Sequence, residues 1–174
     1  MTAGTHLVFS LSSLALIEAC AGASPPLVAL PLVALGSLAP DIDNQGAIVR
    51  LGRWTAPFIG NTAATAVEAP FLRASSLIRS ALGHRGLLHS PLFCVLLYVL
   101  GSAFLGACGG WLAWGYATHL AADACTVSGV PAFAPFGWQR HSLLPIRTGG
   151  RGELVFAAAA VTASVATLLA ARCA

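Results

Sequence analysis

Hydrophobic positions in this chain gather into five blocks that are separated by short or polar connections. A helix that crosses the hydrocarbon core of a bilayer needs about 20 apolar residues, in a range of roughly 17–25. The first, third and fifth blocks meet this length, whereas the second and fourth are short enough to enter the membrane only partly. The pattern predicts an all-α polytopic membrane bundle of four or five transmembrane or partly embedded helices, forming one domain over residues 1–174. The blocks occupy residues 6–22, 27–39, 88–108, 111–125 and 154–171.

Two of the connections between the blocks are short and two are long. The uncharged stretches "GASPP" (22–26) and "GG" (109–110) each predict a tight helical hairpin. The long connections, 40–87 and 126–153, hold nearly all of the arginines, and an excess of basic residues marks cytoplasmic loops. We therefore expect both long connections and the N-terminus on the cytoplasmic side, with the C-terminus outside. Residues 62–82 also form an amphipathic stretch, which favours a helix on the membrane surface despite an internal proline.

The composition strengthens the membrane interpretation. Hydrophobic residues make up 57% of the chain and charged residues only 9%, whereas a soluble domain carries about 25% charged residues. The net charge of +3 comes from scattered arginines without a single lysine, so the chain lacks the basic patch of a nucleic-acid-binding protein. The five cysteines are odd in number and include no CxxC pair, which predicts neither a disulfide framework nor a zinc knuckle.

Ionisable residues gather at one end of the predicted helices. On the topology above, four histidines and three aspartates from four segments reach the cytoplasmic face. His119 and Asp123 are four positions apart and so project from one side of a helix. Ionisable groups within an apolar helix are expensive, so a functional role is the default interpretation. The candidate ligands are His6, Asp41, Asp43, His84, His89, His119 and Asp123.

Each of these residues also has a purely structural explanation. His119 and Asp123 can form a hydrogen bond within their helix. The two aspartates of "LAPDID" (38–43) can cap a turn that ends the second block. His6 and the two histidines of "GHRGLLHS" (83–90) can contact lipid headgroups at the membrane surface. The functional interpretation gains weight because all seven residues reach the same face.

Imidazoles together with carboxylates favour zinc, manganese or iron(II) over calcium, which prefers oxygen ligands alone. Seven candidates exceed the three or four protein ligands of one catalytic zinc. We therefore expect one or two divalent transition-metal ions, with zinc or manganese as the preferred candidates. Such a site polarises a phosphoryl or carbonyl oxygen and lowers the pKa of bound water. Arg85, between His84 and His89, offers a planar guanidinium that binds phosphate or carboxylate through two hydrogen bonds. Alternatively, it only keeps the loop on the cytoplasmic side of the membrane.

The motifs resemble those of a bacterial family of membrane-bound, metal-dependent hydrolases that includes a LexA-regulated inner-membrane protein. The resemblance covers residues 1 to about 155. It implies an inner-membrane location and the same seven ligands. Leu88 and Asn44 depart from its pattern, in which threonine and histidine are common. The motifs are an N-terminal "THL", "LAPDID", "GHRGLLHS", "GYATHLAADACTVSGVPAFAPF" and "LLPIRTGGRGE".

The sequence thus predicts an inner-membrane hydrolase that acts on an ester or phosphoester, with a membrane lipid as the expected substrate because the site lies at headgroup depth. His6 is an added ligand or a general base, and Arg85, Arg147 and Arg151 hold an anionic headgroup. A metal-binding membrane protein without catalysis, either a transporter or a sensor, is the main alternative. Transport favours polar residues along the span, and only Glu18 lies deep on the far side. A third interpretation is a structural protein whose ionisable groups pair with one another.

Overall fold

The fold is known from a computed structural model, which describes residues 1–22, 24–46, 49, 53, 56–58, 60–82 and 86–173. Its main elements are α-helices joined by short 3-10 turns, and the described residues contain only two isolated β-bridges and no strand. The all-α prediction is therefore confirmed. The elements are α1 (Ala3–Ala21), α2 (Ala29–Leu38), η1 (Ala39–Asp43), α4 (Asn61–Leu82), η2 (Leu87–His89), α5 (Pro91–Leu105), α6 (Ala107–Ala124) and α7 (Arg151–Cys173).

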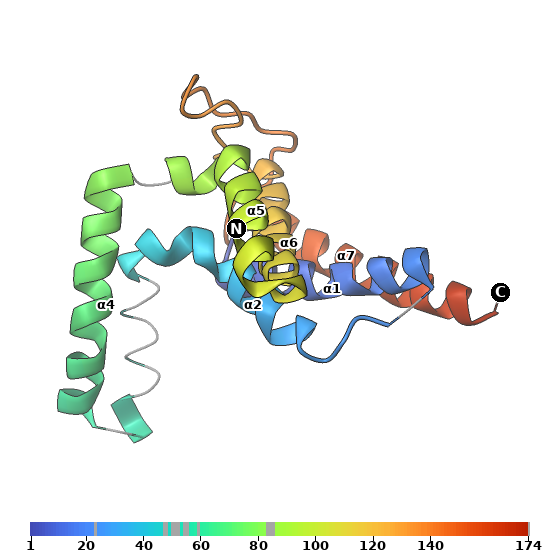
Figure 1. Cartoon of the computed structure of the whole chain (residues 1–174), viewed down its shortest axis with the longest axis horizontal. Coiled ribbons are helices and arrows are strands. Elements are labelled where there is room, and N and C mark those ends of the chain that lie inside the picture. The colour runs from blue at the N-terminus through green and yellow to red at the C-terminus, as the bar shows by residue number, and fades with distance from the viewer. Residues whose placement is uncertain are drawn as a thin grey trace.

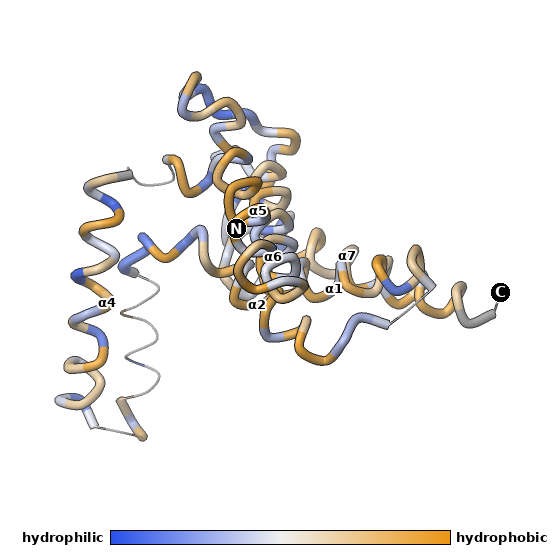
Figure 2. Tube along the Cα trace, viewed as in Figure 1, coloured by the Kyte–Doolittle hydropathy of each residue, from blue (hydrophilic) through white to orange (hydrophobic). Residues whose placement is uncertain are grey.

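Helix α6 lies at the centre of the bundle. It packs against α2, α5 and α1, and α7 packs along α1 on the outside. Figure 1 shows α1 and α7 running side by side towards the C-terminus, while α4 stands apart from the other helices. The amphipathic stretch is thus a helix with Pro70 inside it, and its place on the membrane surface stays a prediction. Figure 2 shows apolar residues along α2, α5 and α7 and mixed polarity along α4.

Helix length and composition agree with a membrane location. Residues Ala3–Ala21 and Arg151–Ala171 are long and apolar enough to cross a bilayer, and α5 is a shorter apolar helix. Helix α5 has no fully buried residue, and it exposes Val95, Val99 and Phe104. An exposed apolar helix of this kind suits contact with lipid. How many of the helices cross the membrane stays a prediction.

Glycines bring α6 close to its two neighbours. A Cβ atom on Gly115 would overlap the carbonyl oxygen of Val33 in α2, and one on Gly109 would overlap the backbone of Gly101 in α5. Small residues of this kind allow close approach of helices in a membrane. The predicted hairpin turn at residues 109–110 is therefore misplaced. The turn lies at Gly106, where φ is +57°, a conformation that glycine tolerates best.

Hydroxyl groups join α1 to α6 and α7. Thr118 donates a hydrogen bond to the hydroxyl of Ser10 over 2.6 Å, and the indole of Trp114 donates to the hydroxyl of Ser13 over 2.8 Å. Ser164 of α7 donates to a backbone carbonyl of α1 over 2.8 Å. Such interhelical bonds are worth about 0.6 kcal/mol on average in a membrane protein. Their main effect is to fix the register of α1 against α6, which positions His6 beside His119.

Candidate metal centre

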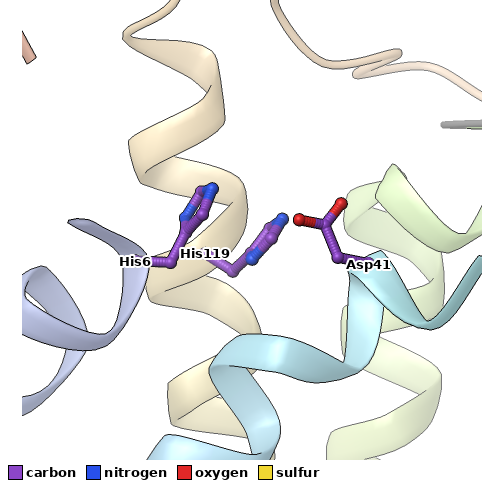
Figure 3. A group of neighbouring side chains, drawn as sticks. All are labelled: His6, Asp41 and His119. Carbon is purple, nitrogen blue, oxygen red and sulfur yellow. The ribbon is translucent and has the colours of Figure 1, made fainter. Parts of the chain in front are cut away.

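Five of the predicted ligands converge where α1, η1, η2 and α6 meet. One group joins His6, Asp41 and His119, and another joins His89, His119 and Asp123. In each group the ligand atoms lie within 4.8 Å of one another. Figure 3 shows the side chains of His6, His119 and Asp41 pointing toward one another from α1, α6 and η1. The convergence that was predicted from loop charges and helix lengths is present for these five residues.

Local sequence explains how the two 3-10 turns deliver their ligands. Pro40 lies in the first turn of η1, where its fixed φ is tolerated and its missing N–H is no loss. The chain therefore leaves α2 in a tight turn that carries Asp41. The turn η2 ends at His89, and Ser90 then caps α5 by accepting a hydrogen bond from the amide of Phe93 over 3.2 Å. The hydroxyl of Tyr116 donates to the carbonyl of Leu88 and holds η2 against α6.

The carboxylate of Asp123 is the centre of the cluster. The Nε2 atom of His6 lies 3.3 Å from Oδ1 of Asp123, and the Nε2 atoms of His89 and His119 each lie 3.6 Å from Oδ2. The Nε2 atom of His89 also lies 3.6 Å from Oδ1 of Asp41. The three imidazoles and Asp123 are almost completely buried. Three ring nitrogens therefore share one carboxylate away from bulk water.

The hydrogen bonding of His119 fixes which of its nitrogens faces the cluster. Its Nδ1 atom lies 2.6 Å from the carbonyl oxygen of Ser37. A carbonyl only accepts, so Nδ1 carries a proton and donates. In the neutral ring Nε2 is then an acceptor, and it faces the acceptor Oδ2 of Asp123. A cation or a proton must lie between two such acceptors. In metal sites, a hydrogen bond from the other ring nitrogen, like that from Nδ1 to the Ser37 carbonyl, orients a histidine ligand.

The remaining ring nitrogens also fit a metal. Neither nitrogen of His6 or His89 has a hydrogen-bond partner among the described residues, and the same holds for Nε2 of His119. An ion held about 2.0–2.1 Å from each tetrahedral ligand sets its ligands roughly 3.4 Å apart. The separations of 3.3 and 3.6 Å around Asp123 match that spacing. The residues present therefore suit a divalent transition metal.

Charge and ring packing also shape the cluster. Burial raises the pKa of the Asp41 carboxyl, but the nearby His89, His119 and His6 lower it by more, so its pKa lies below its usual value. Asp41 therefore stays an anion. The rings of His6 and His119 stack with centroids 3.8 Å apart. The α-amino group of Met1 donates to Oδ1 of Asp123 over 2.6 Å, which gives this carboxylate a cationic neighbour besides the imidazole rings.

Other predicted residues are placed differently. Asp43 is fully buried in η1 but belongs to neither convergent group. His84 and Arg85 lie outside the described residues. Arg147 and Arg151 are exposed, one in the loop before α7 and one at its first residue. The substrate-binding role of the three arginines therefore stays a sequence-based prediction.

Glu153 is a buried acid that the sequence analysis did not single out. It is only 3% exposed, and its carboxylate accepts hydrogen bonds from the amides of Thr2 over 2.5 Å and Gly149 over 2.6 Å. Thr2 caps α1, and its carbonyl accepts a bond from the amide of His6 over 3.1 Å. Glu153 thus ties α7 to the turn that carries His6. The available signal was a lone acid at the start of an apolar block.

The helical bundle and the buried His/Asp cluster define a membrane protein with a candidate metal centre. The chain belongs to the family described as YdjM inner membrane protein, which it matches over residues 1–173. It is 28% identical over 166 residues to the "Uncharacterized protein YvsG" of Bacillus subtilis (strain 168), covering 94% of this chain and 92% of that protein. It is 29% identical over 170 residues to the "Inner membrane protein YdjM" of Escherichia coli (strain K12), covering 88% and 74%. No solved structure matches the chain.

Proposed function

We propose that this inner-membrane protein is a metal-dependent hydrolase that cleaves an ester or a phosphoester. The observation that carries the proposal is the arrangement of His119 and Asp123. The hydrogen bond from His119 to the Ser37 carbonyl leaves Nε2 as an acceptor, 3.6 Å from a carboxylate oxygen of Asp123. A buried pair of this kind calls for a cation or a proton between its two acceptors, and in this proposal a metal ion takes that place. A metal ion that keeps one coordination position for water or substrate serves catalysis.

The ligands that would hold the metal come from four elements. His89, His119 and Asp123 form one group, and His6 and Asp41 join His119 in the other. Zinc or manganese suits this mixture of imidazole and carboxylate, in one or two ions. A bound ion of this type supplies a Lewis acid and lowers the pKa of a coordinated water. Asp43 and His84 complete the proposed ligand set from the sequence pattern.

The chain's own side chains have further roles in this proposal. His6 stacks on His119 with Nε2 directed at Asp123, so it is either a ligand or the base that takes a proton from water. Arg85, Arg147 and Arg151 hold the anionic part of the substrate, because a guanidinium binds phosphate or carboxylate through two parallel hydrogen bonds. The substrate in this proposal is a membrane lipid, because the sequence pattern predicts that the ligands lie at the cytoplasmic ends of apolar helices, at headgroup depth.

The test begins with metal content. Protein purified in detergent without chelator should carry zinc or manganese, measured by mass spectrometry. His119→Ala should lose it while His141→Ala should keep it, since His141 lies in the exposed loop before α7. Metal-loaded protein is then incubated with phospholipids, isoprenoid phosphates and a generic phosphodiester, with and without chelator.

The outcomes separate the three interpretations of the cluster. Chelator-sensitive release of a product supports the hydrolase. Metal binding without cleavage of any ester would instead favour a non-enzymatic transporter or sensor. The absence of metal from both the wild type and His141→Ala would leave a structural role for the ionisable cluster and overturn the proposal.

A further inference from the structure

The loop between α6 and α7, residues 126–150, is pinned by hydrogen bonds between its own backbone groups and by a bond to Ala124 at the end of α6. The amide of Val127 donates to the carbonyl of Ile146 over 3.0 Å, and the amide of Leu143 donates to the carbonyl of Ala124 over 2.7 Å. Val130 and His141 exchange two backbone hydrogen bonds of 3.0 and 2.9 Å. These bonds hold both arms of the loop in one conformation.

The pinned loop has a buried side and an exposed side. Val130 packs with Tyr116 and Leu120 of α6, and Ala134 is 2% exposed. Other residues of the loop expose large apolar side chains. A contiguous exposed apolar patch marks an interaction surface, and the exposed apolar residues of this short loop include Phe133 at 65%, Phe136 at 94%, Trp138 at 58% and Leu143 at 75% exposure.

The charge of the loop indicates what it contacts. Residues 126–150 contain Arg140 and Arg147 and no aspartate or glutamate. Phenylalanine and tryptophan beside arginine suit the boundary between headgroups and acyl chains, and basic residues there are attracted to anionic lipids. The loop also starts from α6, whose neighbour α5 exposes an apolar surface along its whole length. Both the loop and α5 therefore expose apolar side chains that suit lipid.

We propose that the loop of residues 126–150 docks on the same bilayer that holds the helices. Phe133, Phe136 and Trp138 insert at the boundary between headgroups and acyl chains, and the two arginines bind anionic headgroups. The loop begins close to the candidate metal centre, because the hydroxyl of Thr126 donates to the backbone carbonyl of Asp123 over 2.7 Å. The inference requires the membrane location but not the proposed hydrolase activity.

The experiment places single nitroxide labels on the full chain in vesicles of phosphatidylethanolamine and phosphatidylglycerol. All five cysteines are first replaced, and the label is then attached to Phe136→Cys or, with Phe136 intact, to Leu143→Cys. Val99→Cys on α5 is the lipid-facing reference and Asn61→Cys at the start of α4 is the water-facing one. We expect oxygen to relax the loop labels nearly as strongly as the Val99 label, and a water-soluble nickel chelate to reach them weakly.

The outcomes are decisive for the loop in either direction. Chelate access at both loop positions equal to that at Asn61 would overturn the proposal. A label that neither oxygen nor the chelate reaches would also overturn it, because a protein would then cover the loop. In phosphatidylcholine vesicles the chelate should reach the loop labels more easily, since Arg140 and Arg147 lose their anionic partners. Equal access in both kinds of vesicle would contradict the role of the arginines.

Discussion

At the scale of single residues, Asp123 is the carboxylate around which the candidate metal centre is built. Its two oxygens face three imidazoles at 3.3 to 3.6 Å. Metal binding in this cluster therefore depends on both the charge and the shape of the carboxylate. A carboxamide at the same position keeps the shape and removes the charge. It also turns one acceptor into a donor that no longer binds a metal.

We therefore expect Asp123→Asn to lower the affinity for zinc by more than the roughly 10–100-fold that loss of a metal's outer-shell partner causes. Competition between the purified protein and a zinc-binding dye measures this affinity. His141→Gln, in the exposed loop, is the matched control and should bind as the wild type does. Unchanged affinity in Asp123→Asn would show that the cluster is not a metal site built on this carboxylate.

Glu153 acts at the same scale, although it contacts no candidate ligand directly. Glu153→Gln keeps one acceptor oxygen and turns the other into a donor that faces an amide. The amide of Thr2 or Gly149 then loses a hydrogen bond to a charged group, which is worth about 1.5–3 kcal/mol. Thermal unfolding in detergent should show this loss, and zinc affinity should fall with it because the first turn of α1 carries His6.

The control for Glu153 is Glu18, near the C-terminal end of α1. Glu18 accepts a hydrogen bond from the hydroxyl of Ser24 over 2.7 Å in an exposed position. Glu18→Gln should therefore change neither stability nor zinc affinity measurably. If the two variants unfold at the same temperature, Glu153 does not hold α1 in place.

At the scale of elements, the contact between α2 and α6 determines whether His119 meets its partner. Gly115 lies one turn before His119 and lets α6 approach the carbonyl of Val33. Ser37, whose carbonyl accepts from His119, lies one turn after Val33. The spacing of these two backbones therefore sets the length of the hydrogen bond that orients the imidazole.

Gly115→Ala should push α2 away from α6. Overpacking of a close contact costs about 1–3 kcal/mol, so the unfolding temperature and the zinc affinity should both decrease. Gly110→Ala is the matched control, because a Cβ there meets only a ring carbon of Tyr98 at 4.0 Å. Equal stability of the two variants would show that α2 and α6 tolerate a wider spacing.

At the scale of the whole molecule, the candidate centre requires both long loops on one side of the membrane. Single cysteines at Asn61 and Thr148, in a cysteine-free chain, should react with an impermeant maleimide only from the cytoplasmic side. A cysteine at Leu105, beside the turn at Gly106, should react only from the outside. Labelling of Asn61 and Thr148 from opposite sides would contradict the structure, because Asp41 and His119 could then not share a site.

Much of this arrangement follows from the sequence, for reasons that are local. The five apolar blocks correspond to α1, α2, α5, α6 and α7, because long apolar runs leave few alternatives to helix. His119 and Asp123 are four positions apart, and residues at this spacing lie on the same face of a helix. The end of the third block was harder to place, because Gly106, Gly109 and Gly110 all suit a turn and only packing against Gly101 separates them.

The parts that the sequence did not predict depend on contacts between distant residues. The carbonyl of Ser37 is a backbone group, 82 positions from His119, and no residue type marks it as a partner. Glu153 meets the amide of Thr2 across 151 positions, so its isolated position in "GRGE" marked it as unusual but did not indicate its partner. Both contacts arise only once the helices have packed.

The bond between Thr2 and Glu153 has a consequence for the order in which the protein is made. The ribosome adds Glu153 after α1, α2, α5 and α6. A nascent chain that ends before α7 already holds His119 and Asp123, but the turn before His6 has no carboxylate to hold it. We therefore expect the centre to reach its final shape only after the last helix has packed against α1, so that a truncated product is deficient in metal even though it retains all the candidate ligands.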